Sequence, residues 1–99
     1  MLFNFAAMCI KKYMKNRDRM DIISRILEAA NVSSGATKTK IMYKAFLAYS
    51  QLGEYLTFLT ERDLLSYDLD THTFKTTEKG LSFLEVYNKI NYILTKQQI

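Results

Sequence analysis

Apolar residues recur at helical spacing along most of this chain, and one segment near the middle alternates instead. Residues 18–31 carry a single apolar stripe, with Asp18 or Asp21 at its start and Asn31 at its end. This spacing and these flanking residues predict an amphipathic helix that serves the core. The stripe consists of Ile22, Ile23, Ile26, Leu27 and Ala30.

Two short helices are predicted next, after the loop sequence VSSGA: one over about 38–46 and one over about 51–63. Thr37 and Ser50 are the expected N-caps, because a hydroxyl can accept an unpaired N–H of the first helical turn. The corner FLAYS between them is apolar and lacks Pro and Gly, which favours a turn packed between helices.

The second of these helices divides into a core side and an outer side. Leu52, Leu56 and Leu59 follow the core stripe, and Tyr55 lies at its border. The residues left facing outward are Ser50, Gln51, Glu54, Thr57 and Phe58.

The alternating segment LLSYDLDTHTFKTT predicts a two-stranded hairpin with its turn at 70–72. Leu65, Tyr67 and Leu69 should share one side of the first strand, and Phe74 and Thr76 lie in the returning strand. A hairpin this small must pack on the helices.

Thr77 is the expected N-cap of a last helix over about 78–95, where Leu81 and Leu84 should fill the core. A second apolar set has the spacing of a helix packed along a partner helix, which predicts a homodimer. The alternative is that the N-terminal segment covers this face. The predicted dimerisation residues are Phe83, Tyr87, Ile90, Ile93 and Leu94, with Tyr92 widening the face.

The element order therefore predicts a mostly helical α+β fold: a winged helix-turn-helix with a three-helix core, a β-hairpin wing and a long C-terminal helix. The expected divisions are an N-terminal extension over 1–17, the winged domain over 18–77 and a dimerisation helix over 78–99.

Three interpretations fit the extension, which is apolar first and basic afterwards. The extension is a helix packed against the domain or a partner, a helix on a membrane surface, or sequence before a native start at Met20. A secretion signal would place its basic residues before its apolar stretch, which is the opposite order.

Composition narrows the choice of function. The net charge of +4 arises from the first twenty residues, and the rest of the chain holds nine basic and nine acidic residues. Any DNA affinity must therefore depend on where the charges lie. The single Cys9 excludes an internal disulfide and fits a reducing cytoplasmic compartment, and no apolar run is long enough to span a membrane.

Enzymatic chemistry has little support in the sequence. There is no Gly-rich phosphate loop and no Ser/His/Asp or Cys/His grouping, and His72 is the only histidine. We therefore expect no enzyme, no metal, no cofactor and no small-molecule ligand.

A helix pair with a polar outer face is the unit that places a helix in the DNA major groove. Lys38, Lys40 and Lys44 are candidate phosphate contacts, with a merely solvated face as the alternative. Gln51 is the best candidate for reading a base, whereas Glu54 would repel phosphates unless it accepts from cytosine. The remaining candidates are Ser50 and Thr57, the hydroxyls of Tyr43 and Tyr55, and, at the wing, Thr71, His72, Thr73 and Lys75.

The run TKTKIMYKAFLAYSQLGEYLTFLTERDLL, followed by a short hairpin and TTEKG, closely resembles the archaeal winged-helix DNA-binding family. That family includes small dimeric chromatin-associated proteins and predicted transcriptional regulators, and the resemblance covers about residues 20–94. It implies DNA binding through the second and third helices and the wing, and dimerisation through the last helix. Gly53 and the first sixteen residues depart from the family pattern.

The function we expect is that of a dimeric double-stranded-DNA-binding transcriptional regulator on the nucleoid in the cytoplasm. Two alternatives are a non-specific architectural DNA-binding protein and a winged-helix protein–protein interaction module. The neutral core domain and Glu54 are consistent with the second alternative.

Overall fold

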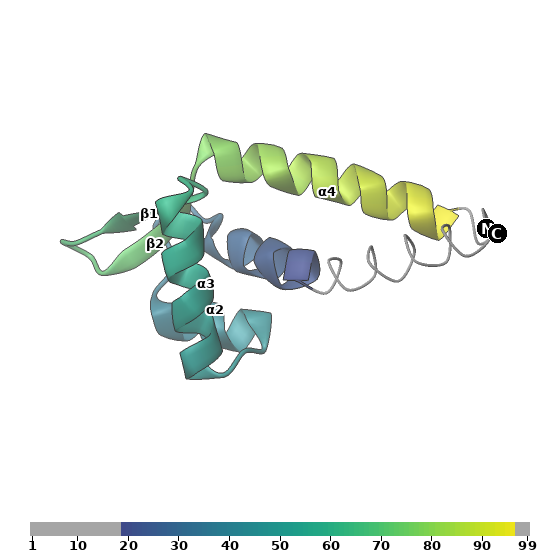
Figure 1. Cartoon of the computed structure of the whole chain (residues 1–99). Helices are drawn as coiled ribbons and strands as arrows, with labels where there is room; N and C mark the ends of the chain where they lie inside the picture. The colour runs from purple at the N-terminus through teal and green to yellow at the C-terminus, as the bar shows by residue number, and fades with distance from the viewer. Residues whose placement is uncertain (1–18, 97–99) are drawn as a thin grey trace.

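The computed structural model describes residues 19–96, which form four helices and one antiparallel hairpin (Figure 1). A first helix covers residues 19–30. The elements after it are α2 (Lys38–Ala45), α3 (Tyr49–Glu61), β1 (Leu65–Asp68), β2 (Thr73–Thr76) and α4 (Glu78–Lys96). The predicted order and the mostly helical α+β class are confirmed. The extension over 1–17, with Cys9, lies outside the described residues.

The core forms where the first helix, α2 and α3 meet. Leu27, Ile41 and Leu52 are fully buried, one from each helix. The predicted stripe of the first helix is confirmed, since Ile26, Leu27 and Ala30 are buried while Ile22 and Ile23 pack against the core from its edge. The stripe of α3 is confirmed as well, with Leu52, Leu56 and Leu59 all buried.

The hairpin is tied to the helices by two contacts that the sequence did not indicate. Ala36, the last residue of the predicted loop, forms a β-bridge with Phe74, with both N–H···O distances at 2.8 Å. The buried Thr76 hydroxyl donates to the Leu27 carbonyl at 2.6 Å. That carbonyl lies in the last turn of the first helix, where carbonyls lack helical partners. A hairpin residue therefore caps the C-terminal end of the first helix, by a hydrogen bond to a residue 49 positions earlier in the chain.

One predicted cap of the helix pair is confirmed and the other is wrong. The Thr37 hydroxyl accepts the Lys40 N–H at 3.3 Å, as predicted. However, α3 begins at Tyr49, and its N-cap is Ala48, which makes no side-chain cap hydrogen bond. Leu47 packs against the core, so the chain turns into α3 earlier than a Ser50 cap requires. Ser50 consequently lies within the first turn.

The corner between α2 and α3 is more exposed than we predicted. Phe46 ends α2 in the left-handed conformation, with φ at 56°, and its side chain is 84% exposed. Tyr49 is also exposed, and only Leu47 of the corner's large apolar residues reaches the core. The chain reverses direction within so few residues that only one of these side chains can point inward. The prediction of a packed corner is therefore wrong.

The hairpin pairs Leu65 with Thr76 and Tyr67 with Phe74. Leu65 is buried, as predicted, but Leu69 is 76% exposed and lies in the turn. The turn starts one residue early because the Asp68 carboxylate accepts the Asp70 N–H at 2.9 Å, a local bond typical of turn-forming Asp. The placement of Leu69 within the strand is therefore wrong.

The predicted start of α4 is confirmed. Thr77 accepts the Gly80 N–H at 3.1 Å, and its hydroxyl also lies 2.6 Å from the Asp63 carbonyl. Leu84 is buried as predicted, but Leu81 is 41% exposed. Gly80 takes the inward position instead, because the helix lies so close to the hairpin that no side chain fits there.

Candidate nucleic-acid interface

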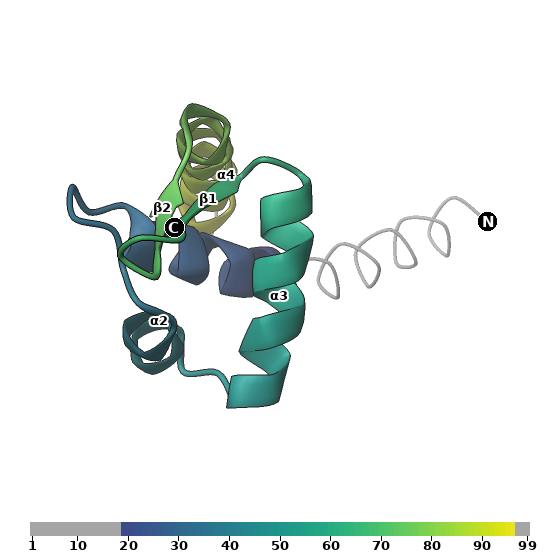
Figure 2. The same cartoon turned by 90° about the vertical axis from the view of Figure 1, so that its left-hand side faces the viewer.

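The helix pair and the hairpin are visible together on one side of the molecule (Figure 2). The hairpin projects on this side, whereas the far end of α4 points to the opposite side (Figure 1). This arrangement leaves α2, α3 and the hairpin available to a single large partner, away from the tip of α4.

The lysines of α2 are the main source of positive charge here. The helix contains three lysines and no acidic residue. Lys40, Tyr43 and Lys44 are exposed and share one face, because positions i, i+3 and i+4 of a helix are neighbours. Among residues 19–96 no ion pair to a carboxylate is formed by these lysines. The charges of Lys40 and Lys44 are therefore free to act on an external anion.

Lys38 lies apart from the other two. Its ammonium nitrogen is 3.9 Å from the centroid of the Tyr49 ring, which is the geometry of a cation–π contact. This contact draws the Lys38 side chain across the helix pair toward α3. The structure therefore divides the predicted lysine cluster into an outer pair and a single inner residue.

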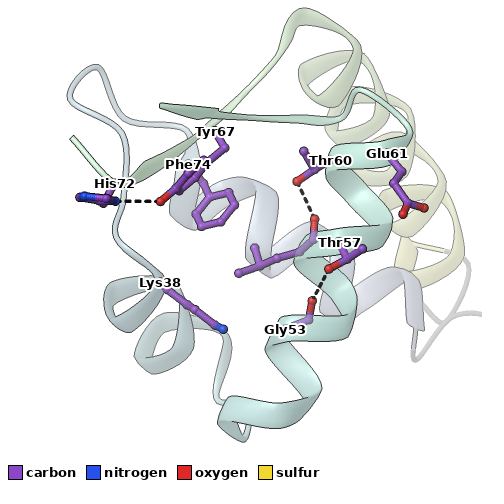
Figure 3. A pocket seen from close by; sticks show the side chains of 9 residues that line it. Lys38, Gly53, Thr57, Thr60, Glu61, Tyr67, His72 and Phe74 are labelled. Carbon is purple, nitrogen blue, oxygen red and sulfur yellow. Dashed lines mark hydrogen bonds between the residues drawn. The ribbon is translucent and has the colours of Figure 1, made fainter. Parts of the chain in front are cut away.

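Lys38 borders a cavity of about 530 Å³ between α3 and the hairpin, which we call the wing-side cavity (Figure 3). The α3 wall consists of Gly53, Leu56, Thr57, Thr60 and Glu61. The hairpin wall consists of Tyr67, His72 and Phe74.

The hairpin side of this cavity is held together by its own side chains. Tyr67 and Phe74 are cross-strand partners whose ring centroids lie 4.7 Å apart. The Tyr67 hydroxyl and His72 Nδ1 are 2.9 Å apart, so His72 keeps its Nε2 atom for an outside partner. His72 has a left-handed backbone, with φ at 55°, and closes the turn. Lys75 is exposed on β2.

A model of the family described as winged helix-turn-helix matches residues 16–95 of this sequence. The chain belongs to the winged helix-turn-helix family. The β1–β2 hairpin is accordingly the wing, and α2 and α3 form the helix-turn-helix. No curated protein sequence matches the chain.

Winged helix-turn-helix domains are typically DNA-binding modules without catalytic activity. Within residues 19–96, no group of three or more His, Cys, Asp or Glu side chains is placed to hold a metal ion. None of the helices described here is long and apolar enough to cross a membrane.

In winged helix-turn-helix proteins the second helix of the pair is the recognition helix, which is α3 here. Its predicted reading residues lie on two sides. Gln51, Glu54 and Tyr55 border a hollow shared with the first helix, whereas Thr57 borders the wing-side cavity. Ser50 lies between these two sides, on the outer face of α3. The structure therefore groups Thr57 with Lys38 and His72, and separates Gln51 from them.

Hydrogen bonding limits what Thr57 can do. Its hydroxyl donates to the Gly53 carbonyl at 3.0 Å, so it keeps only acceptor capacity. Ser50 is exposed and its hydroxyl bonds to no other described residue. Because a phosphate oxygen needs a donor, Ser50 suits a phosphate better than Thr57 does.

The outer face of α3 carries negative charge. Glu54 and Glu61 are exposed and seven residues apart, which places them on the same line of the helix. The helix contains no lysine or arginine, and the Arg62 guanidinium that follows it lies over the Phe58 ring at 4.2 Å. Phosphate contacts are therefore expected from α2 and the wing more than from α3.

Two exposed aromatic residues at this interface, Phe46 and Tyr49, are not among the predicted site residues. A Ser50 N-cap places Tyr49 in the corner, and an apolar corner predicts that Phe46 is packed. A place for Tyr49 at the interface depends on its contact with Lys38, eleven residues earlier in the chain. Residue spacing does not indicate this contact, because the tertiary structure brings the two residues together.

The predicted dimerisation residues on α4 differ in exposure. Phe83 packs against the core and stacks on Tyr87, with ring centroids 6.1 Å apart. Tyr87 is only 5% exposed, and its hydroxyl has no hydrogen-bond partner among the described residues. Ile90 and Ile93 are exposed and Leu94 is half-buried. The accessible part of the predicted face is therefore its C-terminal half.

Proposed function

We propose that this protein is a dimeric double-stranded-DNA-binding protein that acts as a transcriptional regulator on the nucleoid. The observation that carries the proposal is the unpaired positive charge of α2, beside a recognition helix and a wing in a winged helix-turn-helix protein. Polyanion binding of this kind depends on cations whose charge is not already neutralised.

Phosphate contacts are assigned first to Lys40 and Lys44. Both ammonium groups are on the exposed face of α2, and the Tyr43 hydroxyl between them can donate to the same backbone. Lys75 and His72 extend these contacts at the wing. Lys38 is held over Tyr49 and serves the inner end of the interface.

Base reading is assigned to α3. Gln51 can pair with adenine through two hydrogen bonds, and Glu54 can accept from the amino group of cytosine. Tyr55, Ser50 and Thr57 complete the predicted surface. Because Gln51 borders one hollow and Thr57 the other, these two residues on different sides of α3 would read different base pairs.

Dimerisation is assigned to the accessible half of the α4 face, Ile90, Ile93 and Leu94, continuing from Phe83 and Tyr87. Exposed apolar side chains in one line of a long helix favour pairing with a second helix. A dimer would present two helix-turn-helix units to two half-sites.

A second candidate function is that of an architectural DNA-binding protein. It is favoured by the placement of the interface cations on α2 and the wing, with none on α3. Such a protein needs phosphate contacts but little base reading.

Fluorescence-anisotropy titrations against random and selected duplexes at two salt concentrations test the proposal. We expect binding that falls with salt and selectivity for selected duplexes that persists at higher salt. Equal binding to all duplexes would favour the architectural function. No binding at low salt would contradict both and leave a protein–protein interaction module.

A further inference from the structure

We propose that the wing-side cavity binds a small aromatic carboxylate that carries a hydrogen-bond donor at the end opposite its carboxyl group. This site goes beyond the proposed function, since binding of the ligand requires no DNA. The cavity is open to solvent, and its volume of about 530 Å³ is large enough for a small organic ligand.

The walls of the cavity favour a flat ring. The lining includes Leu56 on α3 and the paired rings of Tyr67 and Phe74 on the wing (Figure 3). The Thr57 and Thr60 hydroxyls donate to carbonyls of their own helix, at 3.0 and 2.6 Å. These hydroxyls offer a ligand no free donor, so the middle of the cavity presents mainly apolar surface.

The two ends of the cavity carry opposite charges. Lys38 lies at one end and Glu61 at the other (Figure 3). Neither side chain forms an ion pair or hydrogen bond with another described residue. The Tyr49 ring lies beside the ammonium group of Lys38 and helps to hold it at the cavity. A carboxylate at Lys38 and a donor at Glu61 would satisfy both ends.

The same charges argue against a nucleic-acid strand that runs along the inside of the cavity, as distinct from a duplex that contacts Lys38 and His72 at its rim. A strand that placed one phosphate at Lys38 and continued along the cavity would bring negative charge to Glu61. A molecule with a single anionic head avoids this repulsion. The cavity therefore suits a small organic acid better than a polyanion.

Binding in the cavity would also affect DNA binding. The cavity lies between α3 and the wing, which both belong to the proposed DNA interface, so ligand and duplex should compete. This competition rests on the proposed function, whereas the ligand site itself does not.

The test is calorimetric titration of the full chain with 4-hydroxyphenylacetate, whose carboxylate and phenol lie at opposite ends of one ring. We expect saturable binding that weakens about tenfold or more in Lys38→Met and in Glu61→Gln, because each loses a charged hydrogen-bond partner. The matched controls are Lys89→Met and Glu85→Gln, two exposed residues of α4 that lie outside the cavity. Both variants should bind 4-hydroxyphenylacetate like the native protein. Two related ligands test the same two contacts in the native protein. 4-Methylphenylacetate lacks the donor for Glu61, and 4-hydroxyphenylethanol lacks the carboxylate for Lys38, so each should bind more weakly than 4-hydroxyphenylacetate.

Absence of saturable binding, or an equal loss in the control variants, would overturn the site, provided that circular dichroism shows all variants folded. The competition is then measured by adding 4-hydroxyphenylacetate to a protein–duplex complex. Binding of the ligand without displacement of the duplex would overturn the competition and keep the site. Binding of the ligand by a protein that binds no duplex would support the site and contradict the proposed function.

Discussion

At the scale of single residues, the two helical glycines have opposite roles. A Cβ on Gly80 would come within 2.5 Å of the Leu64 carbonyl oxygen and 2.6 Å of the Thr76 methyl carbon. A Cβ on Gly53 would meet only the Lys38 ammonium, at an ordinary 3.7 Å. Gly80 is therefore needed for the close approach of α4 to the wing, whereas packing does not explain Gly53.

These two positions give a matched pair of substitutions. Gly80→Ala should destabilise the protein by roughly 1–3 kcal/mol, because backbone must shift to admit the methyl group. Gly53→Ala should stabilise it by about 0.5–1 kcal/mol, because alanine loses less conformational entropy in a helix. Thermal unfolding should show melting temperatures that move in opposite directions, by about 4–8 °C per kcal/mol. A fall in melting temperature for Gly53→Ala would contradict this account of Gly53.

Thr76 provides a second residue-scale prediction. Its hydroxyl satisfies the Leu27 carbonyl, while the Asn31 N–H donates to Glu28 instead. Thr76→Val keeps the shape but removes the donor, so it should cost about 1–3 kcal/mol of unfolding free energy. Urea denaturation measures this cost. Thr39→Val, at an exposed threonine of α2 whose hydroxyl bonds to no other described residue, is the control and should change stability little.

At the scale of elements, α2 is the expected source of phosphate contacts. Lys40→Ala and Lys44→Ala should each weaken binding to all duplexes alike and lower the slope of log K against log salt by about one. Salt-dependent anisotropy measures this slope. Lys89→Ala on α4 is the control, since Lys89 lies outside the proposed interface. Unchanged binding in both α2 variants would exclude this helix from the DNA interface.

At the scale of the whole molecule, the prediction concerns assembly. Ile90→Asp and Leu94→Asp should convert a dimer into monomers, because each places a charge within the proposed apolar contact. Light scattering coupled to size-exclusion chromatography measures the mass. Asn88→Asp, on the opposite side of α4, is the control and should leave the dimer intact. A dimer that survives both first changes would place the interface elsewhere.

The sequence predicted the elements well where the signal is local. Leucine spacing placed the core side of α3, and Thr37 and Thr77 marked helix starts, because capping depends on residues only three positions apart. Local reasoning failed to place the start of α3 at Ser50, because that start depends on the packing of Leu47 against the core. It also failed for Leu81, because the inward position of α4 is occupied by Gly80 where the helix meets the hairpin.

The candidate site shows the same division. The exposed lysines of α2 and the outward residues of α3 follow from helical periodicity, so the sequence could identify them. The sequence could not show that Lys38 lies over Tyr49, or that Gln51 and Thr57 face different sides of α3. It also could not reveal the cavity that joins Lys38 to the wing.

The order and type of the elements, their core stripes and most helix starts follow from the amino-acid sequence, because these depend on short-range periodicity and capping. Three features depend on tertiary contacts: the hydrogen bond from Thr76 to the end of the first helix, the apolar residues that stay exposed, and the grouping of charges around the wing-side cavity. Those features arise from contacts between residues distant in the chain, and residue spacing carries no record of such contacts.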